Sequence, residues 1–521
     1  LFTEEERRDM KNMGIELAED ENDALLSERM YAYTALTCAS ERVYLSYPEF
    51  DCAGAEQSPS ILVSRLEHAT TAEKMSTAEL PEAFRLCSEE LAFERLSRFG
   101  KASTPAAAAL REYFAARPLW RERAQNLGVE TKPESFVLSR AQSAADIFGS
   151  RLRVSPSSIE KYENCPFSYF LNSGLSLKER QKAELTPLSN GDIIHYVLQH
   201  VVSAHGGAGI AALSEEELRA EIESVLAEYM NNFFGTAENK PARFLYLYER
   251  LAGTLFKLLR RLGEEFKASE FLPYAFELPV GKGGEVGAYT LTAPDGHEVV
   301  VEGKIDRVDI MDKNGSRFVR VIDYKSGEKV FALSDVYYGL NMQMLMYLFA
   351  IWKDGKGGLK SCVPAGILYM PAINPVLPGE RGDSKEAVAK KENKKLHMNG
   401  LLLNDESVLN AMEPGLHGVF IPVKKGKDGI TSTTEATLAS LEQLGKIKAY
   451  VDGLLLGMAE SLYGGAIPAL PYKKKDRTSC EYCSFAAVCR RSSQSPFRQM
   501  EEFKPDEFYK RTEGGDENGR A

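Results

Sequence analysis

Two aspartates and a lysine occupy matched positions on either side of a predicted hairpin turn. Asn314-Gly315 is a strong signal for a two-residue type I′ turn between two strands. With these residues as the turn, Asp306 lies directly opposite Asp323. Lys325 joins the same face because side chains repeat every two residues along a strand. The sequence therefore predicts that three charged side chains converge at one end of the hairpin.

An apolar stripe leads from the turn to this charged end. The same register pairs Val308 with Val321 on the face of the aspartates, and Ile310 with Val319. The opposite face carries four polar residues, Arg307, Asp309, Arg320 and Tyr324, with Met311, Phe318 and Ile322 among them. One register thus places an apolar stripe and two carboxylates on a single face.

The paired aspartates indicate a cation site. Two carboxylates at roughly 5 Å between β-carbons repel unless a cation lies between them, which suits Mg²⁺ with oxygen ligands and retained waters. A bound metal lowers the pKa of a water molecule, and Lys325 can orient that water or stabilise charge in the transition state. An isolated Asp-x-Lys is more often a salt bridge at a sheet edge. The second aspartate and the apolar approach favour the metal site.

The cysteines indicate a second metal site. Three of the eight lie within ten residues, as Cys480, Cys483 and Cys489 in a C-x2-C-x5-C array. This clustering is unlike a secreted disulfide framework and typical of a metal site in a reducing cytoplasm. The array requires a fourth thiolate from elsewhere, and four thiolates suit either a [4Fe–4S] cluster or zinc. The remaining isolated cysteines are expected to be buried apolar residues: Cys38, Cys52, Cys87 and Cys362.

Helices and strands alternate around these residues and indicate an α/β core. Helices are expected at 191–204, 214–234, 241–268, 334–352 and 432–460, the second beginning with a capping box of Ser214 and Glu217. Strands are expected at 42–48, 271–280, 287–293, 297–311, 317–325 and 363–370. The segment 374–430 is rich in Lys, Gly and Pro without a clear period, which predicts a long surface insertion.

Length and composition bound the organisation. A chain of 521 residues suggests two or three folded units. We expect a mostly helical unit over 1–150, a second unit over 151–495 that opens at Ser155-Pro156, and a partly disordered tail over 496–521. No apolar run approaches the roughly 20 residues of a membrane helix. The chain opens without Met or a signal peptide, so we interpret it as a fragment of a cytoplasmic protein.

The net charge of −11 argues against a protein that coats nucleic acid by bulk electrostatics. It is compatible with an enzyme that grips DNA locally. Positive charge gathers in three places, near 473–477, at Arg490-Arg491 and between Lys385 and Lys395. Such runs are more often solvated faces than DNA contacts.

Four motifs resemble the RecB-type branch of the PD-(D/E)XK nucleases. Gly303-Lys-Ile-Asp306-Arg and Val321-Ile-Asp323-Tyr-Lys325-Ser-Gly match its two catalytic strands. Gly191-Asp-Ile-Ile-His195 matches its upstream helical histidine, and Gln343-Met-Leu-Met-Tyr347 matches its Gln-x-x-x-Tyr helix. The resemblance implies a restriction-endonuclease-like core, a mixed sheet flanked by helices.

The same resemblance assigns roles. It implies that His195, Asp306, Asp323 and the Tyr324 carbonyl bind the metal, that Lys325 is catalytic, and that Gln343 and Tyr347 belong to the site. From the residues alone, His195 is equally consistent with a buried structural histidine. Gln343 and Tyr347 share one helix face and are equally consistent with a surface and a core residue.

A resemblance also supplies the fourth cysteine. Cys165, in Tyr162-Glu-Asn-Cys165-Pro-Phe, is similar to the distant ligand of nucleases with an iron–sulfur staple. This resemblance favours a [4Fe–4S] cluster over zinc and gives it a structural role.

The first 150 residues resemble the end of a superfamily 1 helicase domain. Cys38 in Thr37-Cys38-Ala39 stands where the last helicase motif has an arginine, and the chain has no phosphate-binding loop motif. Together with the nuclease motifs, this resembles the C-terminal part of the AddB/RexB subunits of bacterial helicase–nucleases. The resemblance implies a Mg²⁺-dependent exonuclease that cuts unwound single-stranded DNA beside an AddA-type partner, in double-strand break repair and recombination. The alternative is a nuclease-inactive DNA-binding scaffold with zinc or iron at the cysteines.

Overall fold

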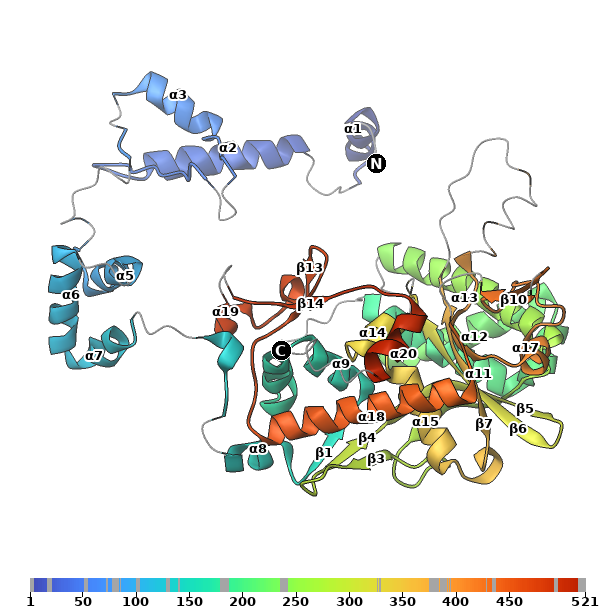
Figure 1. The fold of residues 1–521 in the computed structure, drawn as a ribbon. Helices are drawn as coiled ribbons and strands as arrows, with labels where there is room; N and C mark the ends of the chain where they lie inside the picture. Colours follow the sequence, from blue (N-terminus) through green and yellow to red (C-terminus); the bar gives the residue numbers. More distant parts are fainter. Residues whose placement is uncertain are drawn as a thin grey trace. The chain divides into compact units, whose positions relative to one another are not determined.

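The computed structural model describes most of the chain in two compact units, Leu1–Glu130 and Thr131–Ala521 (Figure 1). The second unit thus begins before the expected boundary at residue 151. Left undescribed are residues 1–3, 16–20, 51–54, 72–73, 77–83, 85, 100–103, 128–131, 139–140, 179–186, 235–241, 326, 328, 374–383, 385–390, 392, 394, 428, 433–436, 492–494 and 514–521.

The first unit is helical. Its helices are α1 (Glu4–Asn12), α2 (Glu21–Thr37), α3 (Ile61–Ala69), α5 (Glu89–Phe99), α6 (Pro105–Ala116) and α7 (Pro118–Gln125). A small core packs Leu96, Phe114 and Trp120 together. The strand expected at 42–48 was wrong. Tyr44 is 84% exposed, and no described strand pairs with this segment, so its alternating pattern has no sheet to join.

A six-stranded mixed sheet organises the second unit, in the order β11-β8-β7-β6-β5-β2 (Figure 1). Its strands are β2 (Leu272–Val280), β5 (Gly303–Lys313), β6 (Ser316–Lys325), β7 (Val363–Pro371), β8 (Asn399–Leu403) and β11 (Thr437–Ala439). β6 and β7 run parallel, whereas β2, β5 and β6 run antiparallel. The expected mixed sheet is confirmed.

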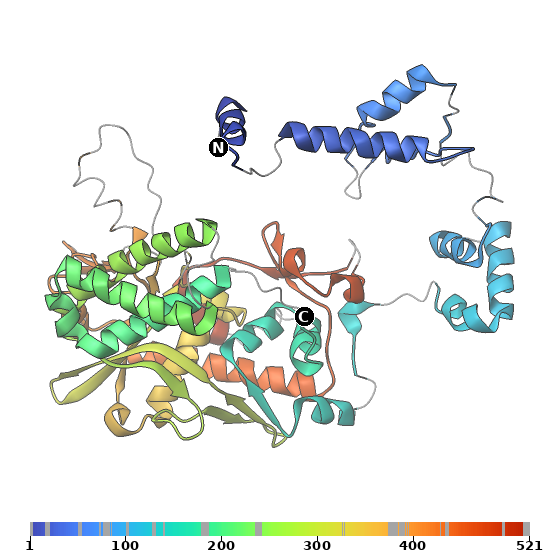
Figure 2. The same cartoon turned by 180° about the vertical axis from the view of Figure 1, so that it is seen from behind.

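Helices cover both faces of this sheet (Figures 1 and 2). α11 (Pro187–Ala212), α12 (Glu215–Phe234) and α13 (Ala242–Ala268) pack together on one face, with α11 against β2. On the other face, α15 (Gln343–Asp354) packs against β6, β7 and α18 (Leu441–Tyr463). One large apolar core joins both layers to the sheet.

Smaller sheets and helices complete this unit. β1 (Arg151–Val154), β4 (Glu298–Val301) and β3 (Tyr289–Thr292) form one sheet, and β13 (Arg477–Thr478), β12 (Tyr472–Lys474) and β14 (Arg498–Met500) form another. β9 (Val423–Gly426) and β10 (Gly429–Ser432) form a hairpin. The remaining helices are α8 (Ala141–Phe148), α9 (Pro156–Asn164), α10 (Pro166–Tyr169), α14 (Leu333–Tyr337), α17 (Glu406–Met412), α19 (Ala486–Cys489) and α20 (Pro505–Glu513).

Three expected elements differ from the structure. The strand at 297–311 is two strands in different sheets, β4 and β5, separated at Glu302. The helix at 334–352 is interrupted between α14 and α15, where Gly339 and Asn341 have positive φ. The helix at 432–460 starts later, at the Ser440 capping box of α18. The expected helix at 214–234 and its Ser214–Glu217 capping box are confirmed.

The segment 374–430 is not wholly a surface insertion. Its C-terminal half supplies β8, which is entirely buried in the main sheet, and α17. Residues 374–383 and 385–390 lie outside the described part. The expected tail also contributes structure, because β14 pairs with β12 and Phe508 of α20 is fully buried. Across the described residues, we find no helix with the length and apolarity needed to span a membrane.

Candidate active site

The predicted hairpin register is confirmed. Val308 pairs with Val321 between β5 and β6, and Asn314 and Gly315 have φ values of 52° and 77°, as a type I′ turn requires. Continued by one residue past the Arg307↔Ile322 pair, the register brings Asp306 opposite Asp323. The backbone N–H of Tyr324 donates a hydrogen bond to Asp306 Oδ2 at 3.1 Å.

A third carboxylate continues the row. Phe276 pairs with Arg307 and Leu278 pairs with Ile305, so Glu277 of β2 lies directly opposite Asp306. Glu277, Asp306 and Asp323 therefore sit side by side on three adjacent strands. Glu277 has a positive φ of 51°, an unusual conformation for a residue other than glycine. The positive φ accompanies a side chain that points toward a histidine of the helical layer.

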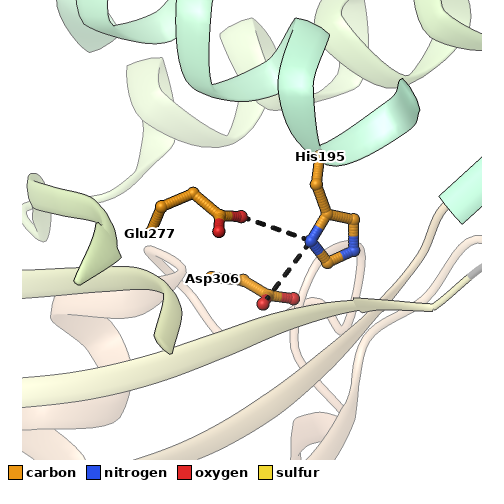
Figure 3. A group of neighbouring side chains, drawn as sticks. All are labelled: His195, Glu277 and Asp306. Carbon is orange, nitrogen blue, oxygen red and sulfur yellow. Dashed lines mark ion pairs between the residues drawn. The ribbon is translucent and has the colours of Figure 1, made fainter. Parts of the chain in front are cut away.

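That histidine is His195 of α11, which reaches between two of the carboxylates (Figure 3). His195 Nδ1 lies 3.4 Å from Glu277 Oε1 and 3.5 Å from Asp306 Oδ1. Its Nε2 lies 3.3 Å from the Tyr324 carbonyl oxygen. One ligand atom from each of His195, Glu277 and Asp306 lies within 4.8 Å of the others, a spacing that suits a shared metal ion. The donor set of one imidazole and several carboxylates fits a divalent cation.

Burial and charge shift the protonation of this group. Burial and the nearby Asp323 raise the pKa of Asp306 to about 7. Burial opposes the charged form of His195, but Glu277 and Asp306 outweigh it and raise the pKa of His195 to about 9. Glu277 also pairs with Lys304. Negative charge therefore concentrates at a buried point that a cation would neutralise.

Lys325 lies at the opposite end of the row from Glu277. Its Nζ lies 2.6 Å from Asp323 Oδ2 and 6.0 Å from the centre of the Tyr369 ring. Asp323 is almost fully buried, whereas Lys325 is about a quarter exposed. The ammonium group therefore stands between the carboxylates and solvent, where a substrate would arrive.

Gln343 and Tyr347 of α15 adjoin the carboxylates. The Tyr347 hydroxyl accepts a hydrogen bond from the backbone N–H of Lys304 at 3.2 Å. Burial raises the pKa of Tyr347, which the Gln343 side chain contacts and to which the charges of Asp306 and Asp323 contribute. A β-carbon at Gly303 would overlap the Tyr347 hydroxyl. The helix thus presses directly on the first residues of β5.

The four cysteines predicted to share a site line one cavity of about 560 Å³. Cys165 lies between α9 and α10, whereas Cys480, Cys483 and Cys489 lie in and around α19. Burial raises the pKa of the Cys165 thiol, and Cys489 and Cys480 add to this shift. None of the four is in a disulfide. Segments from opposite ends of the unit therefore meet at these thiols.

The isolated cysteines follow the prediction only in part. Cys362 is buried as expected, but Cys38 and Cys87 are exposed, so the prediction was wrong for these two. Cys52 lies outside the described residues. In the basic run 473–477, Lys474 pairs with Asp335 and Lys475 pairs with Glu502. Much of that charge is therefore neutralised within the protein.

Comparison with known proteins places this geometry in a family. The model of the PD-(D/E)XK nuclease superfamily matches residues 153–490. The chain belongs to this superfamily. The match spans the histidine, the carboxylate row, the lysine and the four cysteines.

Similar full-length proteins agree with a PD-(D/E)XK nuclease. The chain is 30% identical to the AddB subunit of the ATP-dependent helicase/deoxyribonuclease from Clostridium acetobutylicum, over 100% of this chain and 47% of that protein. It is 30% identical to the protein of the same name from Caldanaerobacter subterraneus, over 94% of this chain and 44% of that protein. For Acetivibrio thermocellus the identity is 29%, over 98% and 46%. The chain spans about half the length of these relatives.

Glu277 is the residue of this PD-(D/E)XK site that the sequence analysis missed. The Asn-Gly turn fixes the register of β5 with β6, but the connection from β2 to β5 is long and contains β3 and β4. A register shift between Pro273 and Ala275 further disturbs the alternation of β2. A glutamate in a strand beside a predicted metal site was the one available signal.

Proposed function

We propose that this chain is the nuclease part of the AddB component of a bacterial helicase–nuclease, and that it hydrolyses phosphodiester bonds of single-stranded DNA with Mg²⁺. The observation that carries the proposal is the convergence of His195, Asp306, Asp323 and Lys325 at one end of the sheet. The names of the relatives support the assignment to a helicase–nuclease. We further propose an exonuclease that processes DNA ends in the cytoplasm, for break repair and recombination.

The residues divide the work of hydrolysis. His195, Asp306, Asp323 and the Tyr324 carbonyl would hold Mg²⁺, and Glu277 adds a further carboxylate beside them. Bound there, Mg²⁺ would activate a water molecule and neutralise charge on the phosphate. Lys325, held by Asp323 at 2.6 Å, is positioned to stabilise negative charge on the reacting phosphate or to orient the water. Gln343 and Tyr347 fix the start of the strand that carries Asp306.

We propose that the four cysteines hold a [4Fe–4S] cluster with a structural role. In a tetrahedral zinc site with Zn–S bonds of about 2.3 Å, the sulfurs lie about 3.8 Å apart. No three of these four sulfurs lie within 4.8 Å of one another, although all four cysteines are among the described residues. The wider spacing and the cavity between the thiols support a larger group than one zinc ion.

The proposed partner is a motor protein of the AddA type. The chain has no phosphate-binding loop motif, and Cys38 replaces the arginine of a helicase motif. Unwinding would then depend on the partner, and the strand cut here would be single-stranded when it arrives. The names of the relatives, each one component of a larger helicase/deoxyribonuclease, support a heteromeric enzyme.

The test is metal-dependent cleavage by the full-length protein. An end-labelled single-stranded oligonucleotide should be degraded with Mg²⁺ and remain intact with a chelator. Asp323→Asn should lose both cleavage and Mn²⁺ binding, measured by electron paramagnetic resonance. Asp312→Asn is the matched control, because Asp312 lies on β5 but pairs with Arg317 far from the site. Wild-type protein that neither binds Mn²⁺ nor cuts DNA would support the scaffold alternative instead.

A further inference from the structure

A buried cluster of four charged side chains lies behind the candidate active site. We call Glu265, Arg307, Asp309 and Arg320 the ionic clamp; all four side chains are fully buried. Arg307 donates two hydrogen bonds of 2.7 Å to the two oxygens of Asp309. Arg320 donates to Asp309 at 2.9 Å and to Glu265 at 2.5 Å, and Arg307 reaches Glu265 at 3.2 Å.

The ionic clamp joins three elements. Glu265 belongs to α13, whereas Arg307 and Asp309 belong to β5 and Arg320 to β6. Asp309 and Arg320 are direct partners in the hairpin register. The contacts therefore tie the helical layer to both strands that carry the catalytic aspartates.

Stability alone does not account for four buried charges. Removing two guanidinium and two carboxylate groups from water is costly, and packed apolar side chains of similar volume often stabilise as well or better. The clamp differs from apolar packing in its geometry. Paired guanidinium–carboxylate hydrogen bonds fix both distance and angle, whereas apolar surfaces can slide.

Tyr324 connects the clamp to the candidate metal ligands. Its side chain is fully enclosed beside Arg307, Asp309 and Glu265, whose charges act on it. Its backbone N–H donates to Asp306, and its carbonyl oxygen faces His195. A displacement of the clamp would therefore move two backbone groups of the site.

The clamp also bears on the helix that carries His195. α11 packs along α13, and Val197 and Val201 of α11 share a fully buried core with Leu259 and Leu262 of α13. Since Glu265 follows Leu262 within one turn of α13, the clamp fixes this helical pair over the hairpin. The separation between His195 on α11 and Asp306 on β5 depends on that placement.

We propose that Glu265, Arg307, Asp309 and Arg320 are positioning residues that hold His195 in register with Asp306 and Asp323. The inference rests on the proposed function, because the site they align is the proposed metal-dependent nuclease. None of the four touches the substrate or the metal. They act through Tyr324 and through the α11–α13 pair.

The test removes one charge of each sign. Glu265→Gln combined with Arg320→Met keeps the cluster neutral and leaves the Arg307–Asp309 pair intact. Measured in the full-length protein well below its melting temperature, this pair of substitutions should weaken Mn²⁺ binding about tenfold or more, as loss of outer-shell support does at other metal sites. The kcat for single-stranded DNA should fall in parallel, while KM and DNA affinity without divalent metal stay near wild type.

Arg261→Met is the matched control. Arg261 lies on α13 one turn before Glu265 and is also buried, but it contacts the Val419 carbonyl and Asn393. This variant should unfold at lower denaturant yet keep wild-type Mn²⁺ affinity and kcat. Equal losses in both variants would reduce the clamp to a structural element and overturn the proposal.

Two further outcomes are informative. If the double variant does not fold, Arg320→Lys replaces it, because lysine keeps the charge but lacks the forked geometry; it should show the same losses. Wild-type Mn²⁺ affinity and kcat in either folded variant would overturn the clamp while leaving the nuclease intact. A wild-type protein that fails to bind Mn²⁺ or cut DNA would instead refute the proposed function.

Discussion

His195 lies between two carboxylates, so metal binding at this residue competes with protons. With the pKa of His195 at about 9, the imidazole is protonated at neutral pH before metal binds, and Asp306 takes a second proton below its pKa of about 7. A metal must displace these protons. Affinity for Mn²⁺ should therefore rise with pH, with about two protons released per ion below pH 7 and about one between pH 7 and 9.

Proton release can be counted by calorimetry in buffers of different ionisation enthalpy. Glu277→Gln removes a group that raises the pKa of His195, so proton release by this variant should fall toward zero at a lower pH than in wild type. His297→Gln is a control histidine variant, because His297 pairs with Asp295 in a turn remote from the carboxylate row. Mn²⁺ affinity independent of pH in the wild-type protein would place the metal away from His195.

Single residues of the site differed in how far the sequence predicted them. Asp306, Asp323 and Lys325 follow from the hairpin register, because the Asn-Gly turn sets which residues face each other. His195 came only from the resemblance, since its distance to Asp306 depends on how α11 packs. Glu277 was missed because the register of β2 is set by tertiary packing and a bulge rather than by a local turn.

At the level of elements, the start of β5 is held against α15 by a glycine. A β-carbon at Gly303 would overlap the Tyr347 hydroxyl and lie 3.0 Å from the ring carbon that carries it. Gly303→Ala should lower the free energy of unfolding by about 1–3 kcal/mol and reduce cleavage, because it displaces the strand that carries Asp306. Urea unfolding and the cleavage assay would measure these effects.

A second substitution tests the cause. Tyr347→Phe removes the overlapping oxygen, so the double variant with Gly303→Ala should recover part of the lost stability. Gly253→Ala on α13 is the control, because its β-carbon would meet no atom within 4 Å. That change should be neutral or slightly stabilising, as expected inside a helix. If Tyr347→Phe restores nothing, the close contact does not determine the cost.

The sequence predicted elements with strong local signals and missed those defined by partners. The Ser214–Glu217 capping box and the hairpin turn are local, and both are confirmed. The division of 297–311 into β4 and β5 is not local, because both strands are apolar and only their sheets differ. β8 was also missed, since the buried run Asn399–Leu403 follows a long polar stretch and needs β7 to become a strand.

At the level of the whole unit, the cysteine cavity joins its beginning to its end. Cys165 precedes every strand of the main sheet, whereas Cys480, Cys483 and Cys489 follow all of them. By extension of the loop-entropy estimate for disulfides, closing so long a loop contributes about 5 kcal/mol. This is comparable to the net stability of a domain. The proposed cluster would thus act as a staple for the nuclease unit.

Cys165→Ser should abolish bound iron and its visible absorbance and should markedly lower the melting temperature. Cys362→Ser is the matched control, because Cys362 is buried but lies away from the cavity. It should keep wild-type iron content. Zinc in place of iron in the wild-type protein would retain the staple but exclude the cluster, and unchanged iron in Cys165→Ser would exclude Cys165 as a ligand.

The most direct test of the proposed active site is the Lys325→Ala variant of the full-length protein. Lys325 contacts Asp323 and faces solvent, so its loss should affect the transition state more than the folded state or the bound metal. Cleavage of single-stranded DNA with Mg²⁺ should fall about a hundredfold or more, while Mn²⁺ affinity, iron content and DNA affinity remain near wild type. A Lys325→Ala protein that cuts single-stranded DNA at the wild-type rate would contradict the assignment of this site.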